Sequence, residues 1–311
     1  MQLSSNIDIL LEAIKDSGLD VEHDVFASNL TTYRIGGKLD NLVNLNTMAD
    51  VKNLSNCLSQ SHMKLAKDDI FILGNGSNVI VADSGFRGIV FKFGGELADI
   101  IDVNEDQSVN VGAGMLLPKF ARKLYVENLT SCEFYVGIPG SVGGAVAMNA
   151  GGHGKQTSDV LVSALSLNLG TGDFKEFSNL ECKFEYRKSI FTEMDMIISA
   201  TYKCLPMVNE NKEVLDNIVK WRRSNQPGGR NIGSVFQNDI TESAGSLIEK
   251  CDLKGFRIGG AFVSEKHANF IQADEGASAI DVISLINHVR DVVKKNTGIE
   301  LKNEVRYIGF N

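Results

Sequence analysis

The spacing of apolar residues along the chain predicts several amphipathic helices. Residues 7–18 carry apolar side chains at helical spacing and end at a glycine, which predicts a helix near the N-terminus. Residues 277–298 show the same spacing, with isoleucines and valines on one face, and close on Gly298, a residue type that often ends a helix. Three shorter segments are also predicted to be helical: residues 117–130, 213–226 and 243–251.

Short β-branched runs separated by Gly, Asn and Asp predict strands between these helices. The runs occupy residues 70–81, 88–93, 108–114, 159–170, 173–178, 196–205, 256–264, 269–274 and 303–309. They do not alternate regularly with helices, so we expect a β-rich chain with inserted helices and not a series of βαβ units. A domain boundary is predicted near Pro206, beyond which the chain reads as an α+β unit.

Composition and charge exclude several classes of protein. The chain has 311 residues, a net charge of −8 and a pI near 5.2, which argues against general nucleic-acid binding. No apolar run is long enough for a membrane span, and the first residues do not resemble a signal peptide. The five cysteines are scattered with no CxxC pair, and no histidine pair has metal-ligand spacing. We therefore expect a cytoplasmic protein with reduced thiols, no metal site and no evident obligate protein partner.

Two glycine-rich segments are candidates for ligand contact. In ILGNGSNVIV, at residues 72–81, the Gly-Asn-Gly-Ser-Asn turn predicts either a hairpin or a nest of backbone N–H groups that holds a diphosphate. It is not a dinucleotide fingerprint of the G-x-G-x-x-G type, because Val79 stands at the last position. FYVGIPGSVGGAVAMNAGGHG, at residues 134–154, holds seven of the thirty glycines and predicts either a crowded turn or close approach to a ligand. Together the two segments favour a bound nucleotide.

Three polar residues stand out more weakly. Arg187 lies in FEYRKSIF, Ser234 follows a glycine in NIGSVFQN, and Glu304 lies in the otherwise β-like terminal strand NEVRYIG. A surface arginine, a turn serine and an exposed strand face explain them equally well. The serine is not part of a GxSxG elbow, so a hydrolase nucleophile is not expected.

Six segments in order give these residues a common context. ILGNGSNVIVADSGFRGIV, VGIPGSVGGAVAMNAGGHG, FEYRKSIF, GSVFQN, AGSLIEKCDLKGFRIGGAFVSEKHANFI and NEVRYIG together closely resemble the UDP-N-acetylenolpyruvoylglucosamine reductase family. The resemblance runs from TTYRIGG at residue 31 to the end of the chain. It is to the shorter form of the family, because no extra loop separates FEYRKSIF from the C-terminal part.

The resemblance implies an α+β fold, with a two-subdomain FAD-binding domain of the PCMH type followed by an α+β substrate domain. Residues 1–86 would form the first FAD-binding subdomain, joined by the returning terminal strand at residues 302–311. Residues 87–206 would form the second subdomain, and residues 207–301 the substrate-binding domain.

The resemblance also assigns site residues. The catalytic residues would be Ser234 as proton donor, with Arg187 and Glu304 as its partners. The UDP-sugar would contact Asn238, Lys254 and His267. FAD would be bound by Tyr33, Arg34, Ile35, Gly74, Asn75, Gly76, Ser77, Asn78, Gly137, Ile138, Pro139, Gly140, Ser141, Gly143, Gly144 and Asn149.

The implied reaction is the NADPH-driven, FAD-dependent reduction of UDP-N-acetylglucosamine enolpyruvate to UDP-N-acetylmuramate, a step of peptidoglycan precursor synthesis. Its chemistry suits the assigned residues, because a carbanion beside a carboxylate needs a nearby positive charge and a proton donor. A lysine such as Lys254 suits the diphosphate of the nucleotide as a point charge.

Departures from the family's usual pattern keep two alternatives open. The chain differs at Asn75, at Gly152 and His153, at Ile232 and at Asp239. One alternative is another FAD-linked oxidoreductase of the same fold, acting on an alcohol or a sugar. The other is a nucleotide-binding protein without catalysis. The joint presence of the serine, arginine and glutamate disfavours the first, because an oxidase has no need of that proton-donor set.

Overall fold

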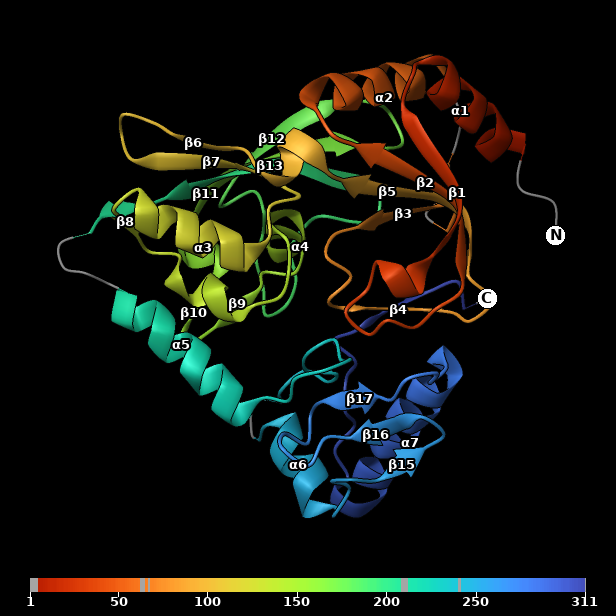
Figure 1. The fold of residues 1–311 in the computed structure, drawn as a ribbon, viewed down its shortest axis with the longest axis vertical. Helices are drawn as coiled ribbons and strands as arrows, with labels where there is room; N and C mark the ends of the chain where they lie inside the picture. The colour runs from red at the N-terminus through yellow and green to blue at the C-terminus, as the bar shows by residue number, and fades with distance from the viewer. Residues whose placement is uncertain (1–4, 62–64, 67, 208–211, 240–241, 311) are drawn as a thin grey trace. The chain divides into compact units, whose positions relative to one another are not determined.

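The computed structural model describes residues 5–61, 65–66, 68–207, 212–239 and 242–310 (Figure 1). The chain divides into two compact units. Unit 1 comprises Met1–His23, Asp40–Asn75 and Arg87–Val219, and unit 2 comprises Asp24–Leu39, Gly76–Phe86 and Lys220–Asn311. The three-part division predicted above, at residues 86, 206 and 301, remains a prediction.

The first part of unit 1 is a four-stranded sheet with two helices. The strand order is β1 (Asp20–Phe26), β2 (Lys38–Leu45), β5 (Phe86–Phe93) and β3 (Ile70–Leu73), and the unit boundary falls within the first three. α1 (Ser5–Asp16) and α2 (Met48–Ser61) share an apolar core with the sheet, to which Leu10, Ile14 and Leu54 contribute. β3 and β5 run parallel, with Leu73 opposite Lys92.

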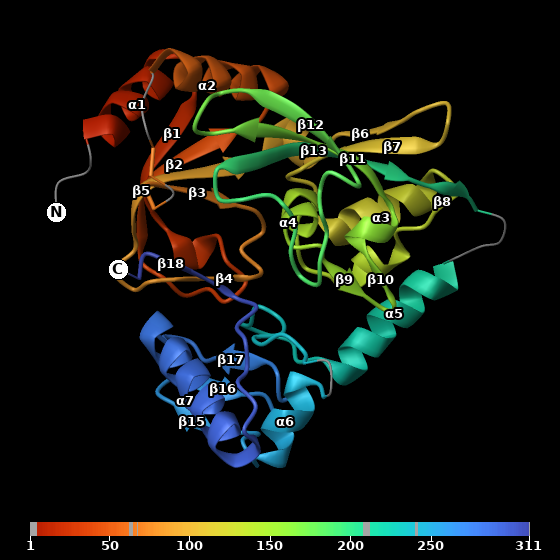
Figure 2. The ribbon, with the colours of Figure 1, turned by 180° about the vertical axis from the view of Figure 1, so that it is seen from behind.

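The second part of unit 1 is a five-stranded antiparallel sheet. Its order is β12 (Phe174–Ser178), β11 (Leu161–Asn168), β13 (Asp195–Lys203), β7 (Ser108–Gly112) and β6 (Ile101–Val103). Figure 2 shows α3 (Leu117–Val126) and α4 (Val142–Ala147) on one side of it. The core between them contains buried aromatic rings, with the centroids of Phe120 and Tyr202 5.0 Å apart and those of Tyr135 and Tyr202 5.9 Å apart.

Short elements complete unit 1. β8 (Leu129–Thr130) pairs with β14 (Leu205–Pro206), and β9 (Gly151–Gly152) pairs with β10 (Lys155–Gln156). α5 (Lys212–Asn225) begins in unit 1 and ends in unit 2. The 3₁₀ turns are η1 (Ala27–Asn29, in unit 2), η2 (Gly95–Ala98), η3 (Glu133–Gly137) and η4 (Thr157–Asp159).

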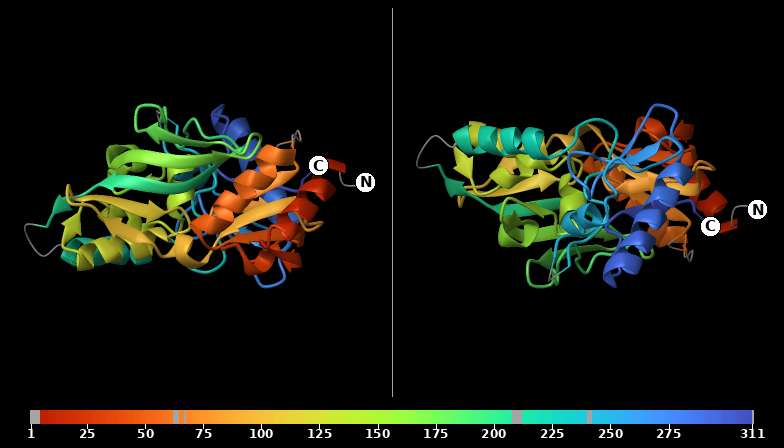
Figure 3. Two further views of the ribbon diagram at one scale, coloured as in Figure 1. Left: turned by 90° about the horizontal axis from the view of Figure 1, so that it is seen from above. Right: turned by 90° about the horizontal axis from the view of Figure 1, so that it is seen from below.

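Unit 2 packs two helices against small sheets. β15 (Arg257–Ile258), β16 (Ala261–Val263) and β17 (Ile271–Ala273) form an antiparallel sheet, and α7 (Ala279–Thr297) lies beside it (Figure 3). α6 (Ala244–Lys250) also contacts α7. The terminal strand β18 (Arg306–Ile308) pairs in parallel with β4 (Val79–Val81). Segments far apart in the sequence therefore form one core.

The ends of α7 show why its sequence forms a helix. Ser278 accepts a hydrogen bond from the N–H of Asp281, and the Asp281 side chain accepts one from the N–H of Ser278, which is a capping box. Gly298 ends the helix in the left-handed conformation, with φ at 75°. The predicted closure of this helix at Gly298 is confirmed.

The predicted α+β class is confirmed, and helices form over all five predicted segments. The hairpin interpretation of residues 72–81 is wrong, because β3 pairs with β5 and β4 pairs with β18. Among the described residues, no helix is long and apolar enough to cross a membrane.

Candidate active site

Ser234 and Glu304, seventy residues apart in sequence, lie on neighbouring backbone segments of unit 2. The N–H of Glu304 donates to the carbonyl of Val235 at 2.8 Å, and the N–H of Val235 donates to the carbonyl of Asn269 at 2.9 Å. Ser234 itself forms an isolated β-bridge with Phe270. The serine is thus held between the segment that precedes β17 and the segment that precedes β18. Both candidate residues are half-buried.

Asn269 fixes the same segment through its side chain, and sequence reasoning missed it. Its amide nitrogen donates to the carbonyl of Phe236 at 2.8 Å, and its amide oxygen accepts from the N–H of Phe236 at 2.9 Å. Asn269 is buried, so both ends of its amide are satisfied where water cannot replace them. Its local sequence, SEKHANFI, is mostly polar up to this residue and gave no signal that the asparagine is buried.

Asn78 connects the Gly-Asn-Gly-Ser-Asn turn to Glu304. Its side chain donates to the carbonyl of Glu304 at 3.1 Å, and its own carbonyl accepts from the N–H of Arg306 at 3.1 Å. Gly76, with φ at 62°, packs so closely that a Cβ there would lie 2.4 Å from the carbonyl oxygen of Leu30. Backbone crowding within unit 2 therefore explains why this position is a glycine.

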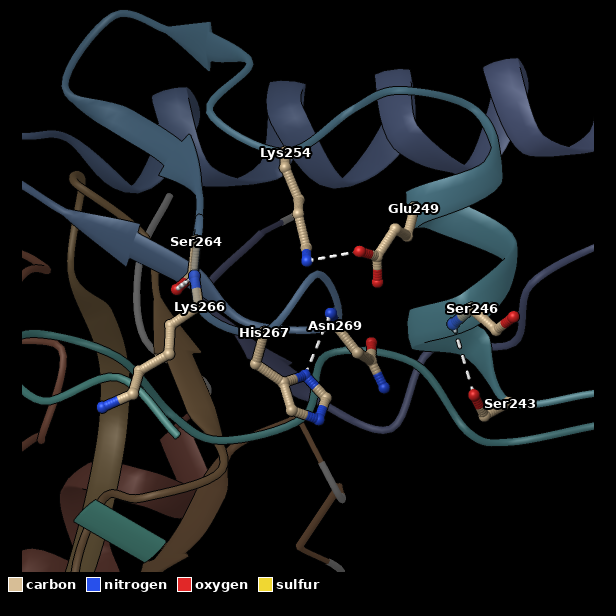
Figure 4. A network of polar contacts seen from close by, with 8 residues as sticks. All are labelled: Ser243, Ser246, Glu249, Lys254, Ser264, Lys266, His267 and Asn269. Carbon is tan, nitrogen blue, oxygen red and sulfur yellow. Dashed lines mark hydrogen bonds and ion pairs between the residues drawn. The ribbon is translucent and has the colours of Figure 1, made fainter. Parts of the chain in front are cut away.

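Lys254 and His267 lie close together on loops of unit 2 (Figure 4). The ammonium of Lys254 forms an ion pair with Glu249 at 2.6 Å. The Nδ1 atom of His267 accepts a hydrogen bond from the N–H of Asn269 at 3.3 Å, which leaves Nε2 as the protonated nitrogen of the neutral ring. Burial is the main cause that lowers the pKa of His267, and the charge of Lys254 lowers it further. At neutral pH His267 is therefore an uncharged hydrogen-bond donor.

The other residues assigned to unit 2 have different surroundings. Asn238 is exposed, and its side-chain oxygen accepts from the N–H of Ala244 at the start of α6. Tyr33 is fully buried, its hydroxyl donates to the carbonyl of Ile271 at 2.8 Å, and burial raises its pKa. Ile35 is also buried, whereas Arg34 is exposed and has a φ of 57°. The side chain of Tyr33 is thus a core element of unit 2.

Arg187 lies in unit 1 at the tip of a tight turn closed by the β-bridge of Glu185 and Lys188. Its φ is 54°, a left-handed conformation for a non-glycine residue. The guanidinium contacts the carbonyls of Asn149 and Gly151, at 3.5 and 3.2 Å, and lies 4.9 Å from the centre of the Tyr186 ring. These contacts tie the arginine to the glycine-rich segment at residues 134–154.

Asn149 makes the same link from the other side. Its amide nitrogen donates to the carbonyl of Glu185 at 3.0 Å, and its amide oxygen accepts from the N–H of Ser158 at 3.0 Å. Only 1% of the residue is exposed, which makes both hydrogen bonds hard to replace with water. Its side chain thus supports the turn that carries Arg187.

The two glycine-rich segments meet in unit 1. A Cβ at Gly74 would lie 2.5 Å from Oγ of Ser141, and the side chain of Asn75 donates to the carbonyl of Pro139. Gly143 packs against Ala113, where a Cβ would come within 3.0 Å. Gly144 is less crowded, with Oγ of Ser141 as its nearest neighbour at 3.4 Å. Of the remaining residues assigned to FAD, Gly137 ends η3 and Ile138 is only partly buried.

The replacements at Gly152 and His153 have a structural explanation. They belong to the hairpin of β9 and β10, whose turn residues His153 and Gly154 have φ values of 54° and 79°. A two-residue hairpin turn with both φ values positive matches the right-handed twist of the strands. Of the other departures, Ile232 is buried in the core of unit 2 and Asp239 is exposed.

Comparison with known proteins shows which family the chain belongs to. The sequence profile of an FAD binding domain matches residues 40–178, and that of the C-terminal domain of UDP-N-acetylenolpyruvoylglucosamine reductase matches residues 225–308. The chain is 39% identical over 282 residues to the UDP-N-acetylenolpyruvoylglucosamine reductase of Halalkalibacterium halodurans, covering 90% of this chain and 91% of the relative. The chain belongs to the UDP-N-acetylenolpyruvoylglucosamine reductase family.

Other relatives agree with this membership. The reductase of Bacillus subtilis is 37% identical over 293 residues, covering 91% of this chain and 92% of the relative. The crystal structure of the family member from Thermus caldophilus has a TM-score of 0.79 at 29% identity, covering 93% of this chain and 99% of that one. A berberine-bridge-enzyme-like protein of Physcomitrella patens, with a TM-score of 0.54 at 13% identity, shares the fold.

The glycine-rich segments have the donor set that an anionic dinucleotide such as FAD requires. Within the described part of unit 1, the backbone N–H groups of Asn75, Gly140 and Ser141 have no hydrogen-bond acceptor. The same holds, within the described part of unit 2, for the N–H groups of Gly76 and Ser77. Clustered free N–H groups in turns bind phosphate oxygens. These residues therefore fit the cofactor of the matched FAD binding domain.

Proposed function

We propose that this chain reduces the enolpyruvyl group of UDP-N-acetylglucosamine enolpyruvate to give UDP-N-acetylmuramate, with NADPH as reductant and FAD as bound cofactor, in peptidoglycan precursor synthesis. Membership of the reductase family supports the reaction. One observation supports this assignment of residues: the N–H of Glu304 donates a hydrogen bond to the carbonyl of Val235. This bond places Ser234 and Glu304 on adjacent backbone segments.

FAD, reduced by NADPH, supplies a hydride when it is bound. A hydride added to the terminal vinyl carbon of the substrate would leave carbanion character on the next carbon, beside the substrate carboxylate. The hydroxyl of Ser234 would donate a proton to this carbon. A hydroxyl is a weak acid, but a carbanion is basic enough to take its proton.

Arg187 and Glu304 would assist by stabilising the developing negative charge. The guanidinium of Arg187 is oriented by two backbone carbonyls, so it can act as a fixed positive charge. The backbone of Glu304 is hydrogen-bonded at both its N–H and its carbonyl, so the point from which its side chain extends is fixed. Preorganised groups of this kind need little rearrangement as the charge develops.

The substrate's nucleotide would be bound by residues of unit 2. Lys254 would bind the diphosphate as a point charge, and this contact would replace its partly exposed ion pair with Glu249. The neutral ring of His267 offers its Nε2 hydrogen, and Asn238 offers a side-chain amide. The cytoplasm is the proposed compartment, because all five cysteines are free thiols. We propose no nucleic acid, membrane or obligate protein partner.

The test is spectroscopic. The purified chain should show a flavin spectrum, and NADPH should bleach it. Addition of UDP-N-acetylglucosamine enolpyruvate should restore the oxidised spectrum. A colourless chain that takes up no FAD would contradict the proposal, and a flavin bleached by a sugar alcohol but insensitive to this substrate would favour an oxidase.

A further inference from the structure

Lys92 is a charged residue near the end of β5, where it follows an apolar segment of the strand. The four residues before it in β5 are buried, and Lys92 itself is half-buried. It lies directly opposite Leu73, the last residue of β3, and Gly74 follows at the start of the Gly-Asn-Gly-Ser-Asn turn. Burial lowers the pKa of the Lys92 ammonium. A cation in this position costs free energy unless something compensates it.

The contacts of Lys92 do not neutralise its charge. Its ammonium donates one hydrogen bond, to the carbonyl of Gly74 at 3.2 Å. No carboxylate of the described residues forms an ion pair with it. An ammonium has three N–H donors, so two have no protein acceptor in the same part of the chain. In a chain with a net charge of −8, an uncompensated half-buried cation calls for an anion from outside the chain.

The surroundings of Gly74 are suited to such an anion. Gly74 packs against Ser141, and Asn75 is hydrogen-bonded to Pro139, so both glycine-rich segments lie at the residue that Lys92 contacts. The free N–H groups of Asn75, Gly140 and Ser141 belong to these same loops of unit 1. A positive charge and several unpaired N–H donors are the features that bind phosphate oxygens.

We propose that Lys92 supplies the positive charge that holds the anionic diphosphate of FAD at the loops of residues 74–75 and 139–141. The inference rests on the proposed function, since it takes FAD as the bound cofactor. The competing role is purely positional: the ammonium would only hold the Gly74 carbonyl and so the shape of the turn. The two roles differ in whether charge or hydrogen bonding matters.

Three substitutions separate these roles. Lys92→Arg keeps the charge, Lys92→Gln keeps a hydrogen-bond donor without the charge, and Lys92→Met removes both. Lys52→Met, at an exposed position of α2, is the matched control for the loss of a lysine. The full-length variants are freed of flavin, their folding is checked by circular dichroism, and FAD is titrated by its fluorescence. The rise in Tm on addition of FAD gives a second measure of binding.

If Lys92 acts through its charge, Lys92→Met and Lys92→Gln both weaken FAD binding about tenfold, equal to about 1.4 kcal/mol. Lys92→Arg and Lys52→Met then keep the affinity of the unaltered chain within about threefold. Unchanged affinity in Lys92→Gln would overturn the inference in favour of the positional role, and unchanged affinity in Lys92→Met would exclude both roles. Failure of the unaltered chain to bind FAD would instead overturn the proposed function, and this inference with it.

Discussion

At the scale of single residues, the candidate site depends on side chains that orient other side chains. Asn269 holds the segment of Ser234, Asn78 holds the backbone of Glu304, and Asn149 supports the turn of Arg187. Each uses a side-chain amide, which can donate and accept at once. The residues proposed to react are therefore fixed by buried or half-buried amides that take no part in the chemistry.

Removal of the proposed proton donor should separate the two halves of the reaction. In Ser234→Ala we expect NADPH to reduce the flavin at nearly the unaltered rate, because the hydroxyl has no role in that step. Turnover of the enolpyruvyl sugar should fall by about 10²–10⁴-fold, the usual loss when a general acid is removed. Stopped-flow absorbance of the flavin measures both steps, and Ser163→Ala in β11 is the control. Equal loss in both steps would refute the role of Ser234.

Asn149 should matter for stability as well as for Arg187. Asn149→Ala leaves the carbonyl of Glu185 and the N–H of Ser158 without their partner in a partly buried place, which should lower the free energy of unfolding by about 2 kcal/mol. Urea unfolding measures this loss. Asn104→Ala, at an exposed position, should change the free energy by less than about 0.5 kcal/mol. Equal effects of the two substitutions would show that the network of Asn149 contributes nothing.

His267 should make stability depend on pH. Its pKa in the folded chain lies below the ordinary value of about 6.5, so below that pH the unfolded chain binds more protons than the folded one. The contribution is therefore present above about pH 6.5 and is lost as the pH falls through the folded pKa. Urea unfolding from pH 7.5 to pH 5 should show the stability difference between the unaltered chain and His267→Gln shrinking. The same substitution at His23, an exposed residue of β1, is the control, and a difference that does not change with pH would contradict the prediction.

At the scale of helices and strands, α7 combines a capping box at its start with a left-handed glycine at its end. Gly298→Ala should therefore lower the free energy of unfolding by about 1 kcal/mol, because a side chain disfavours this conformation although nothing lies within 4 Å of the new Cβ. Gly228→Ala is the matched control, since it too has open space but lacks a positive φ. Thermal unfolding that finds the two variants equal would show that backbone strain at Gly298 is negligible.

Sequence alone predicted the elements whose local pattern is strong. α7 and α3 have clear apolar faces, and Gly298 marks the end of α7. The local pattern did not predict β1 and α2. β1 is mostly exposed, so its residues DVEHDVF show no alternation of buried and exposed positions. The Asn-Gly pair at residues 75–76 predicts a hairpin because it reflects only the local turn. It carries no information on strands much later in the chain, such as β18, with which β4 pairs.

The residues of the candidate site could be predicted only where they lie in motifs of the family. The resemblance named Ser234, Glu304 and Arg187, but spacing could not have brought Ser234 and Glu304 together, because a backbone hydrogen bond between distant segments does so. Asn269 and Lys92 were missed, since nothing in their local sequence distinguishes them from ordinary surface residues. Their contacts became visible only in the fold.

At the scale of the whole molecule, an acidic chain has to bind an anionic cofactor and an anionic sugar nucleotide. Its net charge of −8 does not favour this, so local positive charge must do so. Lys92 and Arg187 in unit 1, and Lys254 in unit 2, are proposed to supply it. Cofactor and substrate would then be bound by local charges and oriented N–H groups, while the rest of the surface repels other polyanions.

The central claim is that this chain reduces the enolpyruvyl sugar at the expense of NADPH, and the stoichiometry of a single turnover tests it most directly. The flavin-loaded chain is reduced by one equivalent of NADPH without oxygen, and UDP-N-acetylglucosamine enolpyruvate is then added. The account predicts that the flavin is reoxidised and that one UDP-N-acetylmuramate forms for each NADPH consumed. A flavin that stays reduced after addition of the substrate, with no UDP-N-acetylmuramate formed, would contradict it.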